Sequence, residues 1–326
     1  MKIARFALTF GLCLSAWMGW SRPENPSVVI DGVKFVYKGM RGGVQLVGVK
    51  QANDLPLGRQ PLVIPAVLDG KPLLSLSDSV LSKSSISSLV LPNSITAVSM
   101  SCCADCSNLE RVVIGARVTD IKRSAFAKCT RLNAVEFAPG SALATVGVLS
   151  FSGCRALTTL SLPSGVKKIS GSAFQGCDRL ARINLPEGLL TIDDGAFAGC
   201  AAMQEIRLPE TLSALGSNVF ANSGLRRLEI PNGVKDLKMG LCSGCATLES
   251  VKLGSNVKTI GRSAFAGCSR LAVFSVPDDS LLERILPLAF KGCSSLTSFS
   301  FPANLKSVDR SAFQNTTISV PAQFVK

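Results

Sequence analysis

Apolar and polar positions along the chain follow a pattern that recurs about every 23 residues. The pattern is clearest over Ile169–Pro186, and it returns over Ile192–Pro209 and Ile260–Pro277. A looser form extends from about Leu76 to Pro321. Self-similarity at a fixed period in the twenties is typical of a stacked solenoid. The pattern therefore predicts one elongated array, although 326 residues would also be long enough for two globular domains.

Two columns of residues mark the register of the repeat. The first holds, in order, Ser84, Cys106, Cys129, Cys154, Cys177, Cys200, Ser223, Cys245, Cys268, Cys293 and Thr316. The second lies three residues earlier and is mostly phenylalanine, with Leu81, Cys103 and Cys242 in three units. Two columns held over eleven units indicate that every unit folds in the same way.

Each unit also contains a short segment that alternates apolar and polar residues, which is the period of a β-strand. Leu157–Pro163 and Leu180–Pro186 are clear cases, each closed by a proline that does not continue a ladder. One such strand cannot bury its apolar face alone. Stacking of successive units therefore predicts a parallel sheet with a continuous core behind it, and the remainder of each unit returns along the outer side.

A tight turn is expected directly before the cysteine column. Glycine stands there in six units and asparagine at Asn222 and Asn315, and both residue types tolerate a positive φ. Lys83, Asp105 and Lys128 occupy the same position in the other units, which predicts that the turn varies.

The repeat resembles the leucine-rich repeat of the BspA-like type, found in bacterial surface and secreted proteins and in treponemal leucine-rich repeat proteins. Its most specific feature is Gly-Cys-x-x-Leu, repeated many times, and the resemblance covers roughly residues 62–321. It implies a strand-dominated repeat solenoid of the α/β type. It also implies a binding or adhesion role, with host extracellular-matrix proteins or other cell-surface proteins as partners.

The start of the chain is typical of a secretion signal. Lys2 and Arg5 precede a mostly apolar run that ends near Trp20. The alternative is an apolar helix of the folded domain. Cys13 adds the option of lipid attachment, although Leu12 before it suits such a signal poorly. We expect export to the periplasm, the cell surface or the medium, with membrane attachment only if Cys13 is lipidated.

Residues after the signal favour a small β cap. Val28–Tyr37 alternates, Asp31-Gly32 is a hairpin turn signal, and Val44–Val49 suits a further strand. We expect an antiparallel β-hairpin cap over about 27–50 that covers the open first strand of the array. The expected domains are a signal peptide at 1–21, the cap and a linker at 22–61, and a solenoid of about eleven units at 62–326.

The cysteines allow two interpretations. In an exported protein, eleven cysteines after the signal first suggest disulfides. Serine and threonine in the same column instead favour buried thiols that satisfy backbone groups inside the turn. We expect most of the column to stay reduced, with Cys102, Cys103 and Cys106 as the exceptions. The pairs Cys103/Cys106 and Cys242/Cys245 lie six units apart, about 29 Å at strand spacing, so they cannot share one metal.

Catalysis is not expected. The chain has no histidine, which rules out Ser–His and Cys–His nucleophile pairs. It also lacks a phosphate loop and a dinucleotide fingerprint. The sequence therefore predicts a protein that is not an enzyme and needs no cofactor or metal.

The exposed strand positions supply the candidate binding residues. These are Arg111, Arg182, Glu205, Arg207, Arg227, Glu229 and Lys252. One interpretation is that the charges pair across strands and keep the sheet soluble. The other is a polar binding stripe on the concave side of the solenoid.

The net charge of +13 favours an anionic partner, such as an acidic protein, a glycosaminoglycan or a membrane surface. Nucleic acid is not expected, because the strands lack interleaved aromatic residues for base stacking. The leading hypothesis is an exported adhesion or protein-binding module. The alternative is a structural envelope protein that self-associates through the C-terminal end, where only five residues follow Thr316–Pro321.

Overall fold

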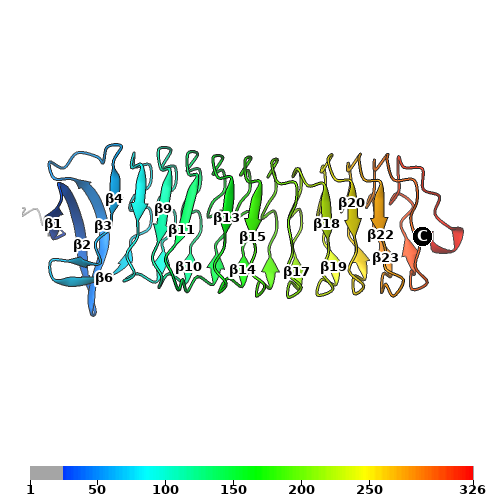
Figure 1. Ribbon diagram of the computed structural model, residues 1–326, viewed down its shortest axis with the longest axis horizontal. Coiled ribbons are helices and arrows are strands. Elements are labelled where there is room, and N and C mark those ends of the chain that lie inside the picture. The colour runs from blue at the N-terminus through cyan, green and yellow to red at the C-terminus, as the bar shows by residue number, and fades with distance from the viewer. Residues whose placement is uncertain (1–24, 326) are drawn as a thin grey trace, which may run out of the picture.

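The computed structural model describes residues 25–325. The predicted signal peptide at 1–21 and Cys13 lie outside the described residues. The chain forms a rod of stacked coils, each coil being one repeat of the sequence pattern (Figure 1). Within the described part, the only helix is the 3₁₀ turn Ala322–Phe324, and no helix has the length and apolarity to cross a membrane.

A five-stranded mixed sheet covers the N-terminal end of the rod. Strands β1 (Ser27–Ile30), β2 (Val33–Met40) and β3 (Gly43–Gln51) pair antiparallel as predicted. Asp31 and Gly32 both have positive φ, which suits the two-residue turn between β1 and β2.

The predicted cap over 27–50 is nevertheless too small, and it is not purely antiparallel. Strand β6 (Lys71–Leu76) pairs parallel with β3, and β5 (Val67–Leu68) pairs antiparallel with β6. These two strands come from the region predicted as array. They complete the cap because β3 would otherwise expose an unpaired edge.

The array presents two strand-bearing faces. Face A is built from the alternating segments: β4 (Pro61–Val63), β7 (Ser88–Val90), β9 (Arg111–Ile114), β11 (Ala134–Phe137), β13 (Thr159–Ser161), β15 (Arg182–Asn184), β18 (Arg227–Glu229), β20 (Ser250–Lys252) and β22 (Val273–Ser275). Face B is built from two-residue strands: β8 (Ala97–Val98), β10 (Asp120–Ile121), β12 (Thr145–Val146), β14 (Lys168–Ile169), β16 (Thr191–Ile192), β17 (Ala214–Leu215), β19 (Asp236–Leu237), β21 (Thr259–Ile260), β23 (Arg284–Ile285) and β24 (Ser307–Val308). All pairs within these two faces are parallel, as the repeat predicts.

Neither face is one continuous sheet. Face A breaks after β11 and again between β15 and β18, and face B breaks between β17 and β19. Lengthened connections follow β11 and β22, where the cysteine column steps by 25 residues. The break before β18 accompanies a shortened connection, because Leu225 follows Ser223 by two residues where Leu180 follows Cys177 by three.

The turn before the cysteine column is the same in every unit, so the prediction that it varies is wrong. Lys83, Asp105 and Lys128 have φ of 60°, 60° and 59°, the left-handed conformation that the glycines also adopt. The cause is the ladder between coils. The N–H of Lys128 donates to Ser152 O at 2.7 Å, and that of Gly153 donates to Gln175 O at 2.8 Å. Each coil must repeat the backbone of its neighbour to keep these bonds.

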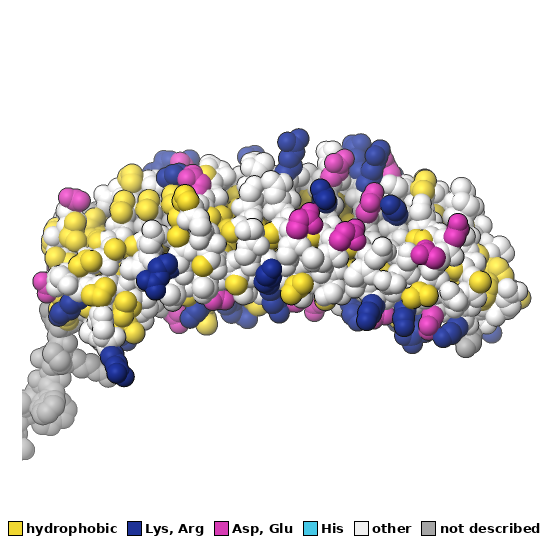
Figure 2. All heavy atoms as spheres, turned by 60° about the horizontal axis from the view of Figure 1, so that its bottom comes forward, with side chains coloured by type: hydrophobic (Ala, Val, Ile, Leu, Met, Phe, Trp, Pro, Cys, Tyr) yellow, Lys and Arg dark blue, Asp and Glu magenta, His cyan; other side chains and the backbone are white. Residues whose placement is uncertain are grey.

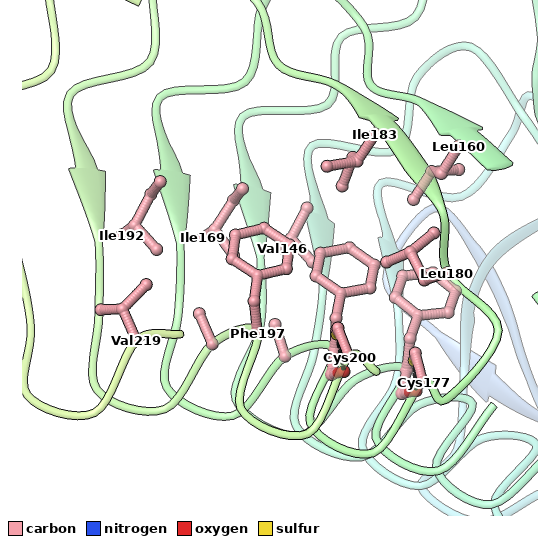
Figure 3. Close-up of a cluster of buried hydrophobic side chains, with 14 of the residues drawn as sticks. Val146, Leu160, Ile169, Cys177, Leu180, Ile183, Ile192, Phe197, Cys200 and Val219 are labelled. Atoms are coloured by element: carbon pink, nitrogen blue, oxygen red, sulfur yellow. Dashed lines mark hydrogen bonds between the residues drawn. The ribbon is translucent and has the colours of Figure 1, made fainter. Parts of the chain in front are cut away.

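The core is a stack of equivalent side chains. Phe126, Phe151, Phe174, Phe197 and Phe220 stack with ring centroids 5.3–6.0 Å apart. Figure 3 shows Ile183 of face A and Ile192 of face B pointing into the interior that holds the Phe197 ring. The two faces therefore share one continuous core.

The thiols of the column satisfy backbone groups, as predicted. All eight cysteines of the column are buried, and each donates to the carbonyl of the Phe-column residue in the preceding coil, at 2.9–3.3 Å. Cys103 and Cys242 fill the Phe column itself and are buried in the core. All eleven described cysteines are free thiols.

At the C-terminal end, the chain folds back over the last coil. Val325 forms a parallel bridge with Val308 of β24, and the Phe324 ring stacks on Phe301 with centroids 6.0 Å apart. The last coil is therefore covered in part by its own chain, whereas the sequence predicts an open end. Self-association through this end stays a hypothesis.

Candidate functional site

All seven candidate residues lie on face A with exposed side chains. Strand pairing places Glu229 directly opposite Lys252, and Arg227 opposite Ser250. The structure separates the seven into two groups, because five of them gather at the break between β15 and β18.

That break contains a hollow of about 740 Å³. Its charged lining includes five of the candidates, namely Glu205, Arg207, Arg227, Glu229 and Lys252. Apolar side chains form the rest of the lining, among them Ile206, Leu208 and Ile230, which are only 4–9% exposed. The hollow thus combines charged side chains with apolar groups that have little contact with solvent.

The backbone within the hollow is unpaired. Residues 203–209 form no strand, although their sequence fits the alternating segment of the repeat. Within residues 25–325, the N–H and C=O groups of Glu205, Ile206, Arg207 and Leu208 have no hydrogen-bond partner. This stretch lies between β15 and β18, which belong to different sheets.

A shortened connection accompanies the break, because Leu225 follows Ser223 by only two residues. The same short step from Ser84 to Ile86 leaves β7 paired with both β4 and β9, so the length of the connection alone does not cause the break. Gly224 approaches the preceding coil so closely that a Cβ on it would collide with the carbonyl group of Ala201. Only glycine fits this approach without moving the backbone.

The charges of the hollow balance and are only loosely paired. Its lining holds Arg207, Arg227 and Lys252 together with Glu205, Glu210 and Glu229. Lys252 lies 3.8 Å from Glu229, and Arg207 lies 3.4 Å from Glu187 outside the hollow. Such exposed pairs contribute about 0–1 kcal/mol, so these side chains are free to exchange partners.

The remaining two candidates lie outside the hollow. Arg111 donates two hydrogen bonds to Glu136, at 2.7 and 2.6 Å. This pairing raises the pKa of Arg111 and lowers the pKa of Glu136. Arg182 lies on β15 and has no carboxylate within 4 Å among the described residues. The interpretation that these charges pair across strands therefore holds for Arg111 and does not hold for Arg182.

A second hollow, of about 730 Å³, lies at the break between β11 and β13. Its lining includes Glu136, Phe137, Leu160 and Leu162. Register counting along face A misses both hollows, because it assumes that every unit pairs with the next. A change in connection length accompanies both breaks, shorter after Ser223 and longer after Phe137, but the equally short connection after Ser84 interrupts no pairing, so this signal alone would not have located them.

No cluster of three or more His, Cys, Asp or Glu residues suited to a metal ion occurs within residues 25–325. The cysteines of both C-x-x-C pairs are buried, and Cys103 and Cys242 occupy the Phe column.

The comparisons with known proteins agree with the architecture. Six copies of a BspA type leucine rich repeat region match residues 70–148, 139–242 and 217–321. No curated protein matches the chain.

Solved structures of bacterial leucine-rich repeat proteins share the fold. A leucine-rich repeat protein from Bacteroides ovatus is 20% identical, with a TM-score of 0.59 over 92% of this chain and 89% of its own. The pneumococcal vaccine antigen PcpA is 18% identical, with a TM-score of 0.52 over 93% of this chain and 85% of its own.

A leucine rich cell surface protein from Faecalibacterium prausnitzii is 21% identical, with a TM-score of 0.51 over 90% of this chain and 93% of its own. At such identities the likeness shows the fold alone. The repeat match covers most of the chain and agrees with the coils, the Phe stack and the thiol ladder described above. The chain therefore belongs to the BspA-type leucine-rich repeat family.

Proposed function

We propose that this protein is an exported, non-catalytic binding protein that holds a protein partner in the hollow of face A. Leucine-rich repeat solenoids typically serve as binding scaffolds. One structural relative is described as a cell surface protein and another as a vaccine antigen, which supports a role outside the cytoplasm. Extracellular-matrix and other surface proteins are the partners that we would test.

The unpaired backbone at Glu205–Leu208 carries this proposal. An extended segment of a partner can pair its main chain with free N–H and C=O groups at a sheet edge. The apolar lining at Ile206 and Leu208 can then receive a side chain of that segment. The charges around the hollow add selectivity, because a like charge placed opposite them costs affinity.

The test is a binding titration of the full chain against immobilised fibronectin, laminin and collagen. Reversal of two charges in the hollow, Arg207→Glu with Arg227→Glu, should weaken saturable binding at least tenfold. The matched control is Arg182→Glu with Arg111→Glu, two reversals on face A outside the hollow, which should leave binding within about twofold.

Thermal unfolding of both variants checks that the fold is intact. Equal losses of affinity in the two variants would show that the hollow is not the binding site. Absence of saturable binding to all three matrix proteins would count against these partners.

A further inference from the structure

A group of exposed cations lies on face B over the last four coils. Its members are Lys235, Lys238, Lys258, Arg262, Arg284, Lys306 and Arg310, and they are called the basic patch here. They lie on or beside β19, β21, β23 and β24, which form one parallel sheet. Figure 2, in which the bottom of Figure 1 comes forward, shows Lys and Arg side chains gathered along the lower edge of this half.

The strand register arranges these cations in rows along the rod. Asp236 pairs with Thr259, Thr259 with Arg284, and Arg284 with Ser307. The residues directly before these positions are therefore also aligned, which puts Lys235, Lys258 and Lys306 in one row with Glu283. Arg262 and Arg310 fall in a second row, three residues after the aligned positions.

The spacing of the rows follows from strand geometry. Neighbouring strands lie about 4.8 Å apart, so four coils span about 14 Å along the rod. Lys258 and Arg262 are four residues apart, which separates the two rows by at most about 13 Å. The basic patch is therefore a compact surface with cations on each of the four coils.

The cations exceed the acidic residues of the same segments. Residues 234–240, 257–263, 282–288 and 305–311 contain the seven cations and three acids, Asp236, Glu283 and Asp309, a net charge of +4. The equivalent segments of the six preceding coils, from 95–101 to 212–218, hold four cations and three acids, a net charge of +1.

Few of these cations are neutralised. Lys306 pairs with Glu283 at 2.9 Å and Lys238 with Asp236 at 3.7 Å. The carboxylate of Asp309 instead accepts hydrogen bonds from the N–H and hydroxyl of Ser311.

Five of the cations have no salt bridge within the part of the chain that the structure describes: Lys235, Lys258, Arg262, Arg284 and Arg310. Lys235 and Lys258 are aligned on neighbouring strands, where like charges repel each other. An anion bound there would relieve this repulsion.

We propose that the basic patch binds a linear polyanionic polysaccharide bearing sulfate or carboxylate groups. A linear polyanion laid along the rod can contact cations on all four coils at once. Arginine adds a planar fork that fits sulfate and carboxylate. The four segments contain no aromatic residue, which disfavours single-stranded nucleic acid, since that binds by base stacking.

This site is separate from the hollow, because the two lie on different faces of the coils. Binding of polysaccharide at face B and of protein at face A can therefore be lost one at a time. The inference does not depend on the proposed function.

The test measures binding of the full chain to heparin, as a sulfated probe, and to alginate, as a carboxylated one, at several salt concentrations. The variant Lys258→Glu, Arg262→Glu, Arg310→Glu should lose at least tenfold in affinity. Its binding should also depend less steeply on salt, because fewer counterions are exchanged.

The control variant is Arg123→Glu, Lys167→Glu, Lys168→Glu, which makes the same change in net charge on face B of earlier coils. It should bind within about threefold of the original chain, as should the face A variant Arg207→Glu, Arg227→Glu. Equal losses in the two triple variants would show that net charge alone causes binding, and would overturn the proposal.

Failure of the original chain to bind either polysaccharide would overturn the proposal as well. Phosphatidylserine vesicles form a third arm. Tighter binding to vesicles than to heparin, lost in the same variant, would reassign the basic patch to a membrane surface.

Discussion

At the scale of single residues, the repeat is defined by groups that satisfy the backbone. Phe151 O, for example, accepts the N–H of Cys154 at 3.1 Å and the thiol of Cys177 at 3.2 Å. A carbonyl oxygen has two lone pairs, so one thiol per coil completes it. The hydroxyls in the same column bond elsewhere: Ser223 contacts the thiol of Cys245 at 3.3 Å, and Thr316 donates to Phe313 O of its own coil at 2.7 Å.

Burial of these thiols predicts a dependence of stability on pH. Desolvation raises the pKa of Cys177 to about 12. An unfolded thiol titrates at about 8.5, so between that pH and about 12 the unfolded state loses a proton that the folded state keeps. The stability that Cys177 contributes is therefore complete below pH 8 and declines as the pH rises through this window.

Urea unfolding at pH 7.5 and pH 10 measures this effect. The free energy of unfolding of the original chain should fall more between these two pH values than that of Cys177→Ser, which has no thiol to titrate at this position. An equal fall in both proteins would show that Cys177 does not ionise on unfolding in this range.

Lys128 offers a second test at this scale, because it adopts φ of 59° where six units have glycine. A left-handed conformation costs most L-residues about 1–2 kcal/mol, part of which glycine returns as entropy in the unfolded state. Lys128→Gly should therefore stabilise the protein, by roughly 0.5–1 kcal/mol.

The comparison substitution is Lys167→Gly, at an exposed position beside β14 that is not left-handed, where glycine should destabilise. Urea midpoints of the two variants measure the difference. A destabilising Lys128→Gly would mean that the lysine side chain stabilises this turn by more than the strain costs.

At the scale of elements, the candidate binding site lies at a break in a sheet and not on a paired strand. Strands β7, β9 and β11 stay paired with one another, although the connection before β7 is one residue shorter than those before β9 and β11. Residues 203–209 lack such pairing, next to the shortened connection through Gly224. The hollow and the free main-chain groups lie at this break.

Hydrogen exchange tests this description of the break. Four backbone amides in the hollow have no acceptor in the described chain and should exchange within seconds: those of Glu205, Ile206, Arg207 and Leu208. Amides of the paired strand β9 should exchange at least a hundredfold more slowly.

Mass spectrometry of peptides that cover 203–209 and 111–114 would compare the two rates. Protection of 203–209 as strong as that of β9 would mean that the face A sheet is continuous in solution. A bound partner that pairs with the hollow should slow exchange in 203–209 alone.

At the scale of the whole molecule, the rod separates different surface chemistries. The hollow on face A carries balanced charges around apolar groups, whereas the basic patch on face B carries a net charge of +4 over four coils. The overall charge of +13 therefore does not describe the hollow. Because each coil contacts only its neighbours, surface residues can differ along the rod without changing the core.

The sequence by itself determined the solenoid, its register and its interior. Period, columns and strand alternation are local properties, and repetition makes each of them visible many times. The buried Phe and Cys columns and the parallel strands were predicted for this reason.

Only the tertiary structure decided where the repeat is interrupted and how it ends. The same one-residue shortening occurs after Ser84 and after Ser223, yet β7 stays paired with both neighbours while the strand at Glu205–Leu208 is lost. Three further features depend on contacts between coils. These are the use of β5 and β6 in the cap, the constant turn at Lys128, and the fold-back of Val325 onto Val308. Such contacts satisfy backbone groups across long separations in the chain, and no local pattern encodes them.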